Sequence, residues 1–256
     1  PTSGEILYNG QNIVDYSTKQ MKEMRKKMQI IFQDPFTSLN PRMSVSEIIA
    51  EPMITTKTLK NNTERLDRVY RLMETVGLAE RFINSYPHEL DGGRRQRIGI
   101  ARALSVDPEF IVCDEPVSAL DVSIQAQILN LMMDLQDEMG LTYMFVTHNL
   151  SVIKHISNNI AVMYLGQCVE HAPTNELFAH PQHPYTKALL NAIPIASLKD
   201  RKKLEIIKGE VTSPINPKPG CRFADRCPYV TDRCREDGLK LREVAPKHYV
   251  ACRLHE

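Results

Sequence analysis

The chain has 256 residues and a formal net charge of +1, from 32 Lys and Arg against 31 Asp and Glu. This balance disfavours a nucleic-acid binder that works through a broad basic surface. A hydrophobic content of 42% is typical of a globular protein, and six cysteines are too few for a disulfide scaffold. No apolar run approaches the roughly 18 to 20 residues of a membrane-spanning helix, so we expect none.

The first 86 residues predict a hairpin, a strand and then helices. Asn9-Gly10 follows a short strand-like segment and is a strong signal for a tight β-turn. The apolar run 28–32 predicts a short buried strand, which Pro35 would end. Apolar residues between Leu66 and Val76 repeat at helical spacing. We therefore expect a helical subdomain over about 41–104, inserted between strands.

Strands and helices alternate over residues 87–148. A helix is expected after Gly92-Gly93, and the apolar run 110–113 is typical of a strand buried on both faces of a parallel sheet. The next helix carries apolar residues three and four positions apart and would end at Gly140, before a strand over 142–146. Strand, helix and strand in this order predict a βαβ unit and an α/β fold.

The composition shifts after about residue 195. A basic cluster at 199–203 precedes a proline-rich stretch, and four of the six cysteines fall near the end of the chain. We therefore expect one domain over 1–195 and a small cysteine-rich module over 196–256.

The clearest candidate for chemistry is a pair of carboxylates at the end of the 110–113 strand. Ligands of open α/β sheets bind beyond the carboxyl ends of the strands. There, Asp114 is suited to hold a Mg²⁺ that bridges phosphates, and Glu115 is suited to polarise an attacking water. The same pair also suits the start of a helix, whose N-terminus attracts negative charge. Taken alone, the two carboxylates leave both interpretations open.

Neighbouring residues favour the phosphate-binding interpretation. Gly92 and Gly93 would let backbone N–H groups at a helix N-terminus approach a phosphate. The segment Ser118–Asp121 follows the carboxylates, and His148 lies at the end of the next strand. A Gly-Gly pair is usually only a turn, and a lone His is usually a surface residue. The order of these features along the chain is what makes the signal specific.

Together these residues resemble the ATP-binding cassette (ABC) ATPases of ABC transporters, which have a P-loop NTPase-like α/β fold, over nearly the whole chain. The resemblance implies ATP and Mg²⁺, with Gln33 in the Q-loop, Asp114 ending the Walker B strand, Glu115 as catalytic base and His148 as switch histidine. It assigns a signature motif, which acts on ATP held by a partner subunit, to Leu90, Asp91, Gly92, Gly93, Arg94 and Gln96. It assigns the D-loop to Ser118, Ala119, Leu120 and Asp121.

Three further segments, 33–41, 183–186 and 213–217, resemble the dipeptide and oligopeptide importers, whose close relatives carry nickel. Within that group the chain is more similar to the second ATPase of the pair, the F type. The resemblance implies an ATPase subunit that energises peptide import, with nickel as the alternative cargo. It also implies a paralogous ATPase partner, two transmembrane permeases, an extracytoplasmic substrate-binding protein reached indirectly, and no nucleic acid. The expected location is the cytoplasmic face of a bacterial or archaeal membrane.

One departure from the family pattern concerns the phosphate loop. No Gly-x-x-x-x-Gly-Lys-Ser/Thr segment occurs in the sequence, and the family places that loop before the segment that opens this chain. We therefore expect an N-terminal truncation, and we predict that this stretch alone does not bind ATP tightly. A non-catalytic cassette remnant is the alternative function. A soluble cassette ATPase of DNA repair or translation is disfavoured, because those usually carry a second cassette or long coiled-coil insertions.

A second departure lies in the signature, where Asp91 and Arg94 stand at positions that are usually Ser and Gln. A carboxylate only accepts hydrogen bonds and repels phosphate, and Arg94 would offset that charge. We hypothesise that the ATP site completed by this signature is weakened or specialised, beside a more regular second site in a heterodimer.

The C-terminal cysteines form a separate candidate site. Cys221, Cys227, Cys234 and Cys252 are suited to bind Zn²⁺ or an iron–sulfur cluster, or they stay reduced. Their spacing lacks the close cysteine pair of the usual zinc sites and suits a larger cluster. Resemblance to importers with this tail implies a [4Fe–4S] cluster. Cys113 and Cys168 are expected to be small buried apolar residues.

Overall fold

The computed structural model describes residues 1–193, 207, 209, 213 and 215–256. These residues form two compact units, Pro1–His148 and Asn149–Glu256. The predicted boundary between residues 195 and 196, together with the basic cluster at 199–203, lies outside the described residues.

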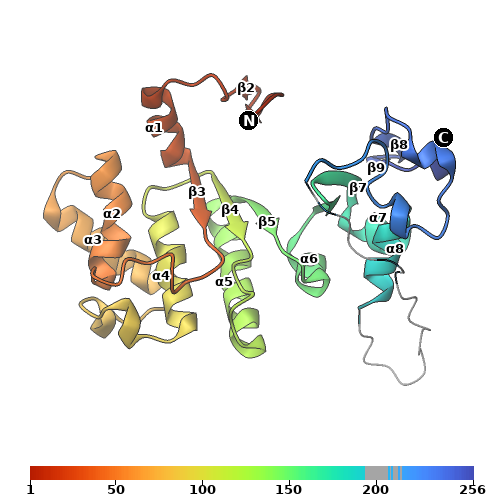
Figure 1. The fold of residues 1–256 in the computed structure, drawn as a ribbon. Coiled ribbons are helices and arrows are strands. Elements are labelled where there is room, and N and C mark those ends of the chain that lie inside the picture. The colour runs from red at the N-terminus through yellow and green to blue at the C-terminus, as the bar shows by residue number, and fades with distance from the viewer. Residues whose placement is uncertain (194–206, 208, 210–212, 214) are drawn as a thin grey trace. The chain divides into compact units, whose positions relative to one another are not determined.

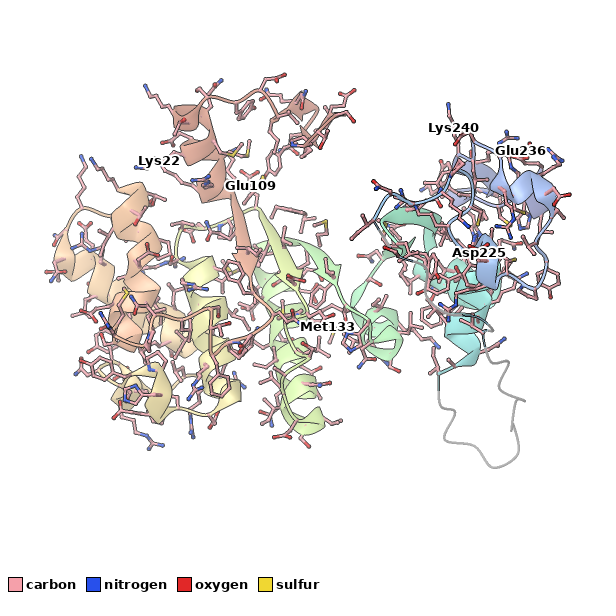
Figure 2. All side chains as sticks on the ribbon, viewed as in Figure 1. Lys22, Glu109, Met133, Asp225, Glu236 and Lys240 are labelled. Carbon is pink, nitrogen blue, oxygen red and sulfur yellow. The ribbon has the colours of Figure 1, made fainter. Side chains whose placement is uncertain are left out.

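The first unit opens with a hairpin and a helix. Strands β1 (Leu7–Tyr8) and β2 (Gln11–Asn12) pair antiparallel around Asn9-Gly10, whose φ angles of 48° and 78° suit the predicted tight turn. Helix α1 (Thr18–Lys27) follows, and Ser17 and Gln20 form a capping box at its start. The hairpin and α1 both contact Glu109, which Figure 2 labels, through Tyr8 at 2.8 Å and Lys27 at 3.0 Å.

A three-stranded parallel sheet forms the centre of this unit. Its strands, in order across the sheet, are β3 (Met28–Ile31), β4 (Phe110–Asp114) and β5 (Thr142–Val146), and each coincides with an apolar run in which a strand was predicted. Helix α5 (Val122–Met139) connects β4 to β5 and ends at Gly140, whose φ of 66° suits glycine. Because the three strands are parallel, their carboxyl ends lie at one edge of the sheet.

Three helices pack beside this sheet, as Figure 1 shows. They are α2 (Val45–Thr56), α3 (Asn62–Thr75) and α4 (Gly92–Leu104). Two 3₁₀ turns, η1 (Glu80–Phe82) and η2 (Pro87–Glu89), lead into α4. Ser44 caps α2 with Glu47 in a capping box. The helices share an apolar core whose side chains are at most 2% exposed: Val45, Ile48, Ile49, Met53, Val69, Leu72, Met73, Ile98, Ile100 and Leu104.

The second unit is built on an antiparallel sheet with the order β6-β7-β9-β8. Its elements are α6 (Leu150–Ile156), β6 (Asn159–Tyr164), β7 (Gln167–Pro173), α7 (Thr174–Ala179), α8 (Pro184–Asn191), η3 (Ala224–Arg226), η4 (Asp232–Arg235), β8 (Arg242–Ala245), β9 (His248–Val250) and η5 (Arg253–His255). Strand β9 pairs with β7 through Glu170 and Val250. This differs from the separate module expected over 196–256, because the last strands extend the sheet that β6 and β7 begin.

The core of the second unit contains a cluster of aromatic rings and a buried pair of polar side chains. The Phe223 ring lies 5.3 Å from Tyr164 and 5.4 Å from Tyr185, between ring centroids. Beside it, Glu170 and His248 are both fully buried and their side chains meet at 2.8 Å. Glu170 also accepts the backbone N–H of His183 at 2.9 Å. These contacts join β7, β9 and the start of α8.

Candidate functional site

Three predicted residues meet at the carboxyl edge of the parallel sheet. Gln33 lies two positions after β3, Glu115 directly after β4, and His148 two positions after β5. The Nε2 of Gln33 donates to the Glu115 carboxylate at 2.8 Å. The Nδ1 of His148 lies 2.8 Å from the other oxygen of the same carboxylate. The parallel register thus gathers side chains that are far apart in the sequence.

The backbone of Glu115 is in the left-handed region, with a φ of 43°. For a residue other than glycine, this conformation costs on the order of 1 kcal/mol, and such strain is concentrated at functional sites. Two hydrogen bonds hold it: the Glu115 N–H donates to the Val146 carbonyl at 2.8 Å, and the Ser118 hydroxyl donates to the Glu115 carbonyl at 3.0 Å. The strain and its support favour a functional role over simple helix capping.

The electrostatics of the site keep Glu115 ionised. The hydrogen bond with His148 is the main reason that the pKa of Glu115 is lowered, with smaller contributions from Ser118 and Gln33. The Glu115 side chain is 21% exposed, and that of His148 is 75% exposed. An ionised, partly shielded carboxylate at an open sheet edge can accept a proton from a bound water.

Asp114 is the last residue of β4 and is half-buried next to Glu115. Carboxylate and amide oxygens are the ligands that Mg²⁺ prefers. The hydrogen bond of Gln33 to Glu115 uses its Nε2, so that contact does not consume its amide oxygen. The chemistry of Asp114 and Gln33 therefore fits the predicted magnesium site.

Asp91 has a local structural role at the start of α4. Its carboxylate accepts the backbone N–H of Arg94 at 2.8 Å and pairs with the Arg94 guanidinium at 2.7 Å. It is therefore the N-cap of the helix, a position at which Asp and Ser are about equally effective. The cap explains how a carboxylate is accommodated at this position.

Packing leaves little space beside the two signature glycines. A Cβ on Gly93 would lie 2.8 Å from the Ile124 side chain, and one on Gly92 would lie 3.1 Å from Leu120. The start of α4 thus packs against the end of the predicted D-loop. This contact could not be predicted from the residues, because glycine is equally expected where a phosphate approaches the backbone.

The predicted signature residues do not all reach the surface. Leu90 is 5% exposed and Gln96 is 1% exposed, whereas Asp91 is exposed and Arg94 is half-buried. Three of the D-loop residues, Ser118, Ala119 and Asp121, are exposed. Within the predicted signature, the exposed and half-buried residues therefore lie in the first turn of α4 and at its N-cap.

The four C-terminal cysteines lie close enough to influence one another. The N–H of Cys221 donates to the Cys234 carbonyl at 2.8 Å, and burial, with repulsion from the other three thiols, raises the pKa of Cys221 to about 11. Even so, the described residues contain no group of three or more His, Cys, Asp or Glu arranged to hold a metal ion. The predicted cluster stays a prediction. Cys113 is fully buried, as expected, and Cys168 is half-buried.

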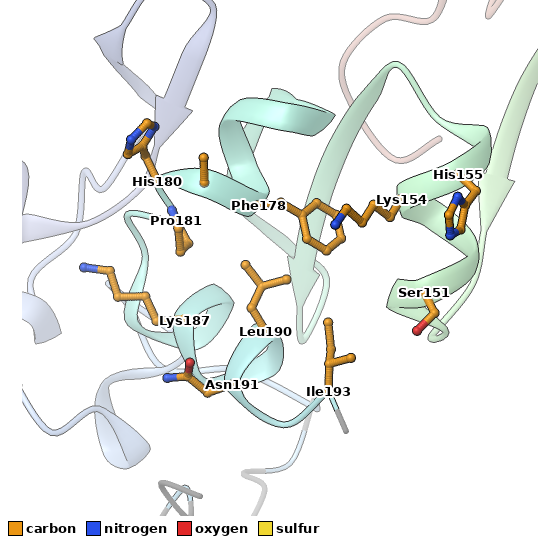
Figure 3. Close-up of a pocket in the computed structure, with 11 residues that line it drawn as sticks. Ser151, Lys154, His155, Phe178, His180, Pro181, Lys187, Leu190, Asn191 and Ile193 are labelled. Carbon is orange, nitrogen blue, oxygen red and sulfur yellow. The ribbon is translucent and has the colours of Figure 1, made fainter. Parts of the chain in front are cut away.

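A cavity of about 740 Å³ opens in the second unit. Figure 3 shows Lys154 beside the Phe178 ring, with Leu190 and Lys187 on α8. None of the predicted site residues is among the described residues that line this cavity.

Solved structures with the same fold define the class of the protein. The structure of cbiO1 from Clostridium perfringens, described as part of the ABC transporter complex cbiONQ, matches 70% of each chain at 29% identity with a TM-score of 0.63. The dimeric ABC transporter cassette MJ0796 matches 68% of this chain and 75% of its own at 29% identity, with a TM-score of 0.60. The fold is that of an ABC ATPase cassette.

Sequence relatives narrow the class. The ABC transporter family model matches residues 1–118, and the model of the oligopeptide/dipeptide transporter C-terminal region matches residues 169–234. The putative oligopeptide transport ATP-binding protein YkfD of Bacillus subtilis is 51% identical over all of this chain and 78% of its own length. The dipeptide transport ATP-binding protein DppF of Haemophilus influenzae is 49% identical over 98% of this chain and 77% of its own. The chain belongs to the oligopeptide and dipeptide transport ATP-binding proteins of the ABC family.

These findings confirm the predicted family and α/β fold. Among the described residues, no helix combines the length and apolar character that crossing a bilayer requires.

Proposed function

We propose that this protein is the ATP-hydrolysing subunit of an ABC importer for peptides. The observation that carries the proposal is the contact of Glu115 with both Gln33 and His148 at the carboxyl edge of the sheet. The relatives named above are oligopeptide and dipeptide transport proteins, which favours peptides over nickel as the cargo. Their names also favour the ATPase over the non-catalytic remnant.

In this proposal each residue at the sheet edge has a distinct task. Glu115 accepts a proton from the water that attacks the terminal phosphate of ATP, and His148 holds the Glu115 carboxylate in position. Asp114 and Gln33 would hold Mg²⁺, which neutralises phosphate charge when it is bound. Gln33 contacts Glu115 directly, so a movement of the segment after β3 changes the surroundings of the catalytic carboxylate.

The proposed assembly follows from the exposed first turn of α4 and the exposed D-loop. A paralogous ATPase subunit would face these residues in a head-to-tail dimer, and two permeases would contact the segment that follows Gln33. A substrate-binding protein would act outside the membrane. The protein would then sit at the cytoplasmic face of the membrane through its permease partners.

The test uses the transporter assembled from the intact protein, its partner ATPase and its permeases, in vesicles. We expect MgATP to drive uptake of a labelled dipeptide or oligopeptide with its binding protein present. Nickel uptake should stay at the level of vesicles without ATP. Nickel uptake driven by MgATP, without peptide uptake, would contradict the proposed cargo, and uptake without ATP hydrolysis would contradict the proposed activity.

We further propose that Cys221, Cys227, Cys234 and Cys252 bind a [4Fe–4S] cluster, with Zn²⁺ as the alternative. The support is their mutual electrostatic influence and the hydrogen bond between the Cys221 and Cys234 backbones. Protein purified without oxygen should contain about four iron and four sulfide per chain. Cys234→Ser should lower both, whereas Cys168→Ser, at a cysteine outside the group, should not. Stoichiometric zinc, or no metal at all, would contradict the cluster.

A further inference from the structure

An arginine on α4 stacks against the segment that follows Gln33. The guanidinium carbon of Arg95 lies 3.7 Å from the centroid of the Phe36 ring. Arg95 is only 7% exposed, and its Nε donates to the Pro87 carbonyl at 2.6 Å. A buried guanidinium needs such partners, and an aromatic face within about 6 Å attracts it. Phe36 is itself 60% exposed, so its apolar burial does not account for its position.

A second arginine of α4 contacts the same segment. Arg102 lies seven residues after Arg95, about two helical turns, and so on the same face. Its Nη1 donates to the Ser38 carbonyl at 2.7 Å, and its guanidinium carbon lies 5.9 Å from the centroid of the Phe32 ring. The segment 32–38 is thus attached to α4 at both of its ends.

The segment is also internally fixed next to the catalytic carboxylate. Asp34 accepts the Phe36 N–H at 2.7 Å and the Thr37 hydroxyl at 3.1 Å, which makes a tight local turn. Gln33 immediately precedes this turn and donates to Glu115 at 2.8 Å. A shift of Phe36 is therefore transmitted over three residues to the Gln33 amide.

The other end of the connection is the exposed first turn of α4. Arg95 follows Arg94 directly, and Arg94 is held to Asp91, the N-cap of the helix. A helix turn is rigid, so a displacement of the Asp91–Arg94 turn moves Arg95 with it. Arg95 would carry such a displacement to the Phe36 ring, whose centroid lies 3.7 Å from its guanidinium carbon.

We propose that the Arg95–Phe36 stack is a positioning contact that couples the start of α4 to Gln33, and through Gln33 to Glu115. It makes the catalytic carboxylate of this chain sensitive to a partner that engages the first turn of α4. The inference rests on the proposed ATPase function.

The test compares variants of Phe36 and Arg95 in the assembled transporter. Phe36→Leu removes the aromatic face, whereas Phe36→Tyr keeps it and is the matched control. We expect Phe36→Leu to lower kcat for MgATP by about 5- to 30-fold at nearly constant KM, and Phe36→Tyr to restore most of the rate. Arg95→Lys keeps the charge but loses the planar stack, and should lower kcat similarly.

The double variant makes the test specific. If the stack is the link, Phe36→Leu combined with Arg95→Lys should lower kcat no further than either change alone. The inference would be overturned if the losses of kcat in the two single variants multiply in the double variant. It would also be overturned if Phe36→Leu has the wild-type kcat, or if Phe36→Tyr loses as much kcat as Phe36→Leu. A wild-type transporter without ATPase activity would instead refute the proposed function, so the two failures are distinguishable. Equal urea unfolding of the variants and the wild type checks that the fold is unchanged.

Discussion

At the residue scale, the catalytic candidates are held by position and by hydrogen bonds. Gln33, Glu115 and His148 follow three neighbouring parallel strands, so their meeting could be predicted once the strands were recognised. The left-handed backbone conformation of Glu115 could not be predicted. Apart from Pro116, no residue after Asp114 restricts the backbone dihedral angles at this point.

Asp91 is one of the two signature residues that differ from the expected family pattern. Asp91→Ser keeps a good N-cap and removes the ion pair with Arg94, so its effect on stability should stay below about 1 kcal/mol. If the carboxylate weakens the ATP site that this signature completes, transport-coupled ATP hydrolysis should rise several-fold. In the double variant Asp91→Ser with Arg94→Gln, the rate of ATP hydrolysis should rise by at least the same factor.

The measurement is steady-state MgATP hydrolysis by the assembled transporter with and without its peptide. Arg94→Gln alone leaves Asp91 unpaired and serves as the control, since it should lower the rate. An unchanged rate in Asp91→Ser would show that the carboxylate has no influence on this site.

At the element scale, helices and strands with local signals were predictable and long-range pairings were not. The capping boxes at Ser17 and Ser44 and the αL glycine at Gly140 are signals written within a few residues. The pairing of β7 with β9 joins residues about 80 apart, Glu170 and Val250, and carries no local signal. Glu170 and His248 are both fully buried there, although Glu is rarely fully buried.

The start of α8 makes the second unit sensitive to acid. His183 is 1% exposed, its Nδ1 accepts the Tyr185 N–H at 3.1 Å, and burial lowers its pKa to about 4. Its unfolded pKa is near 6.5. Because the folded pKa is lower, the unfolded chain binds more protons between these values, so stability is present above pH 6.5 and is lost as the pH falls toward 4.

We expect the second unit to lose about 2 kcal/mol of unfolding free energy between pH 7 and pH 5 from this one group. Urea unfolding followed by tyrosine fluorescence measures it, since the chain has nine Tyr and no Trp. His183→Asn keeps an N-cap acceptor and should flatten the pH dependence, whereas His180→Asn, at an exposed histidine nearby, should not. Equal pH dependence in all three proteins would contradict this account.

At the scale of the whole molecule, the first unit was predictable and the second was not. The three parallel strands follow apolar runs, and α3 and α5 carry helical repeats, in the order of an ABC cassette, whereas the polar helix α1 has neither signal. In the second unit, the composition shift after about residue 195 suggested a division. The described residues form compact units that are divided after His148, and β8 and β9 belong to the sheet of β6 and β7; the predicted domain boundary stays a prediction.

The central claim is that Glu115 is the catalytic carboxylate, and Glu109 offers a matched control. Glu109 precedes the same strand, β4, at its other end, and contacts Tyr8 and Lys27 instead of Gln33 and His148. Both residues can be changed to Gln, which keeps the shape of the side chain and removes its charge.

The measurement that tests the claim most directly is peptide-stimulated MgATP hydrolysis by the assembled transporter, with ATP binding measured in parallel. The account predicts that Glu115→Gln lowers hydrolysis by about 100-fold or more while ATP still binds, and that Glu109→Gln stays near the wild-type rate. A Glu115→Gln protein that hydrolyses ATP at the wild-type rate would contradict it.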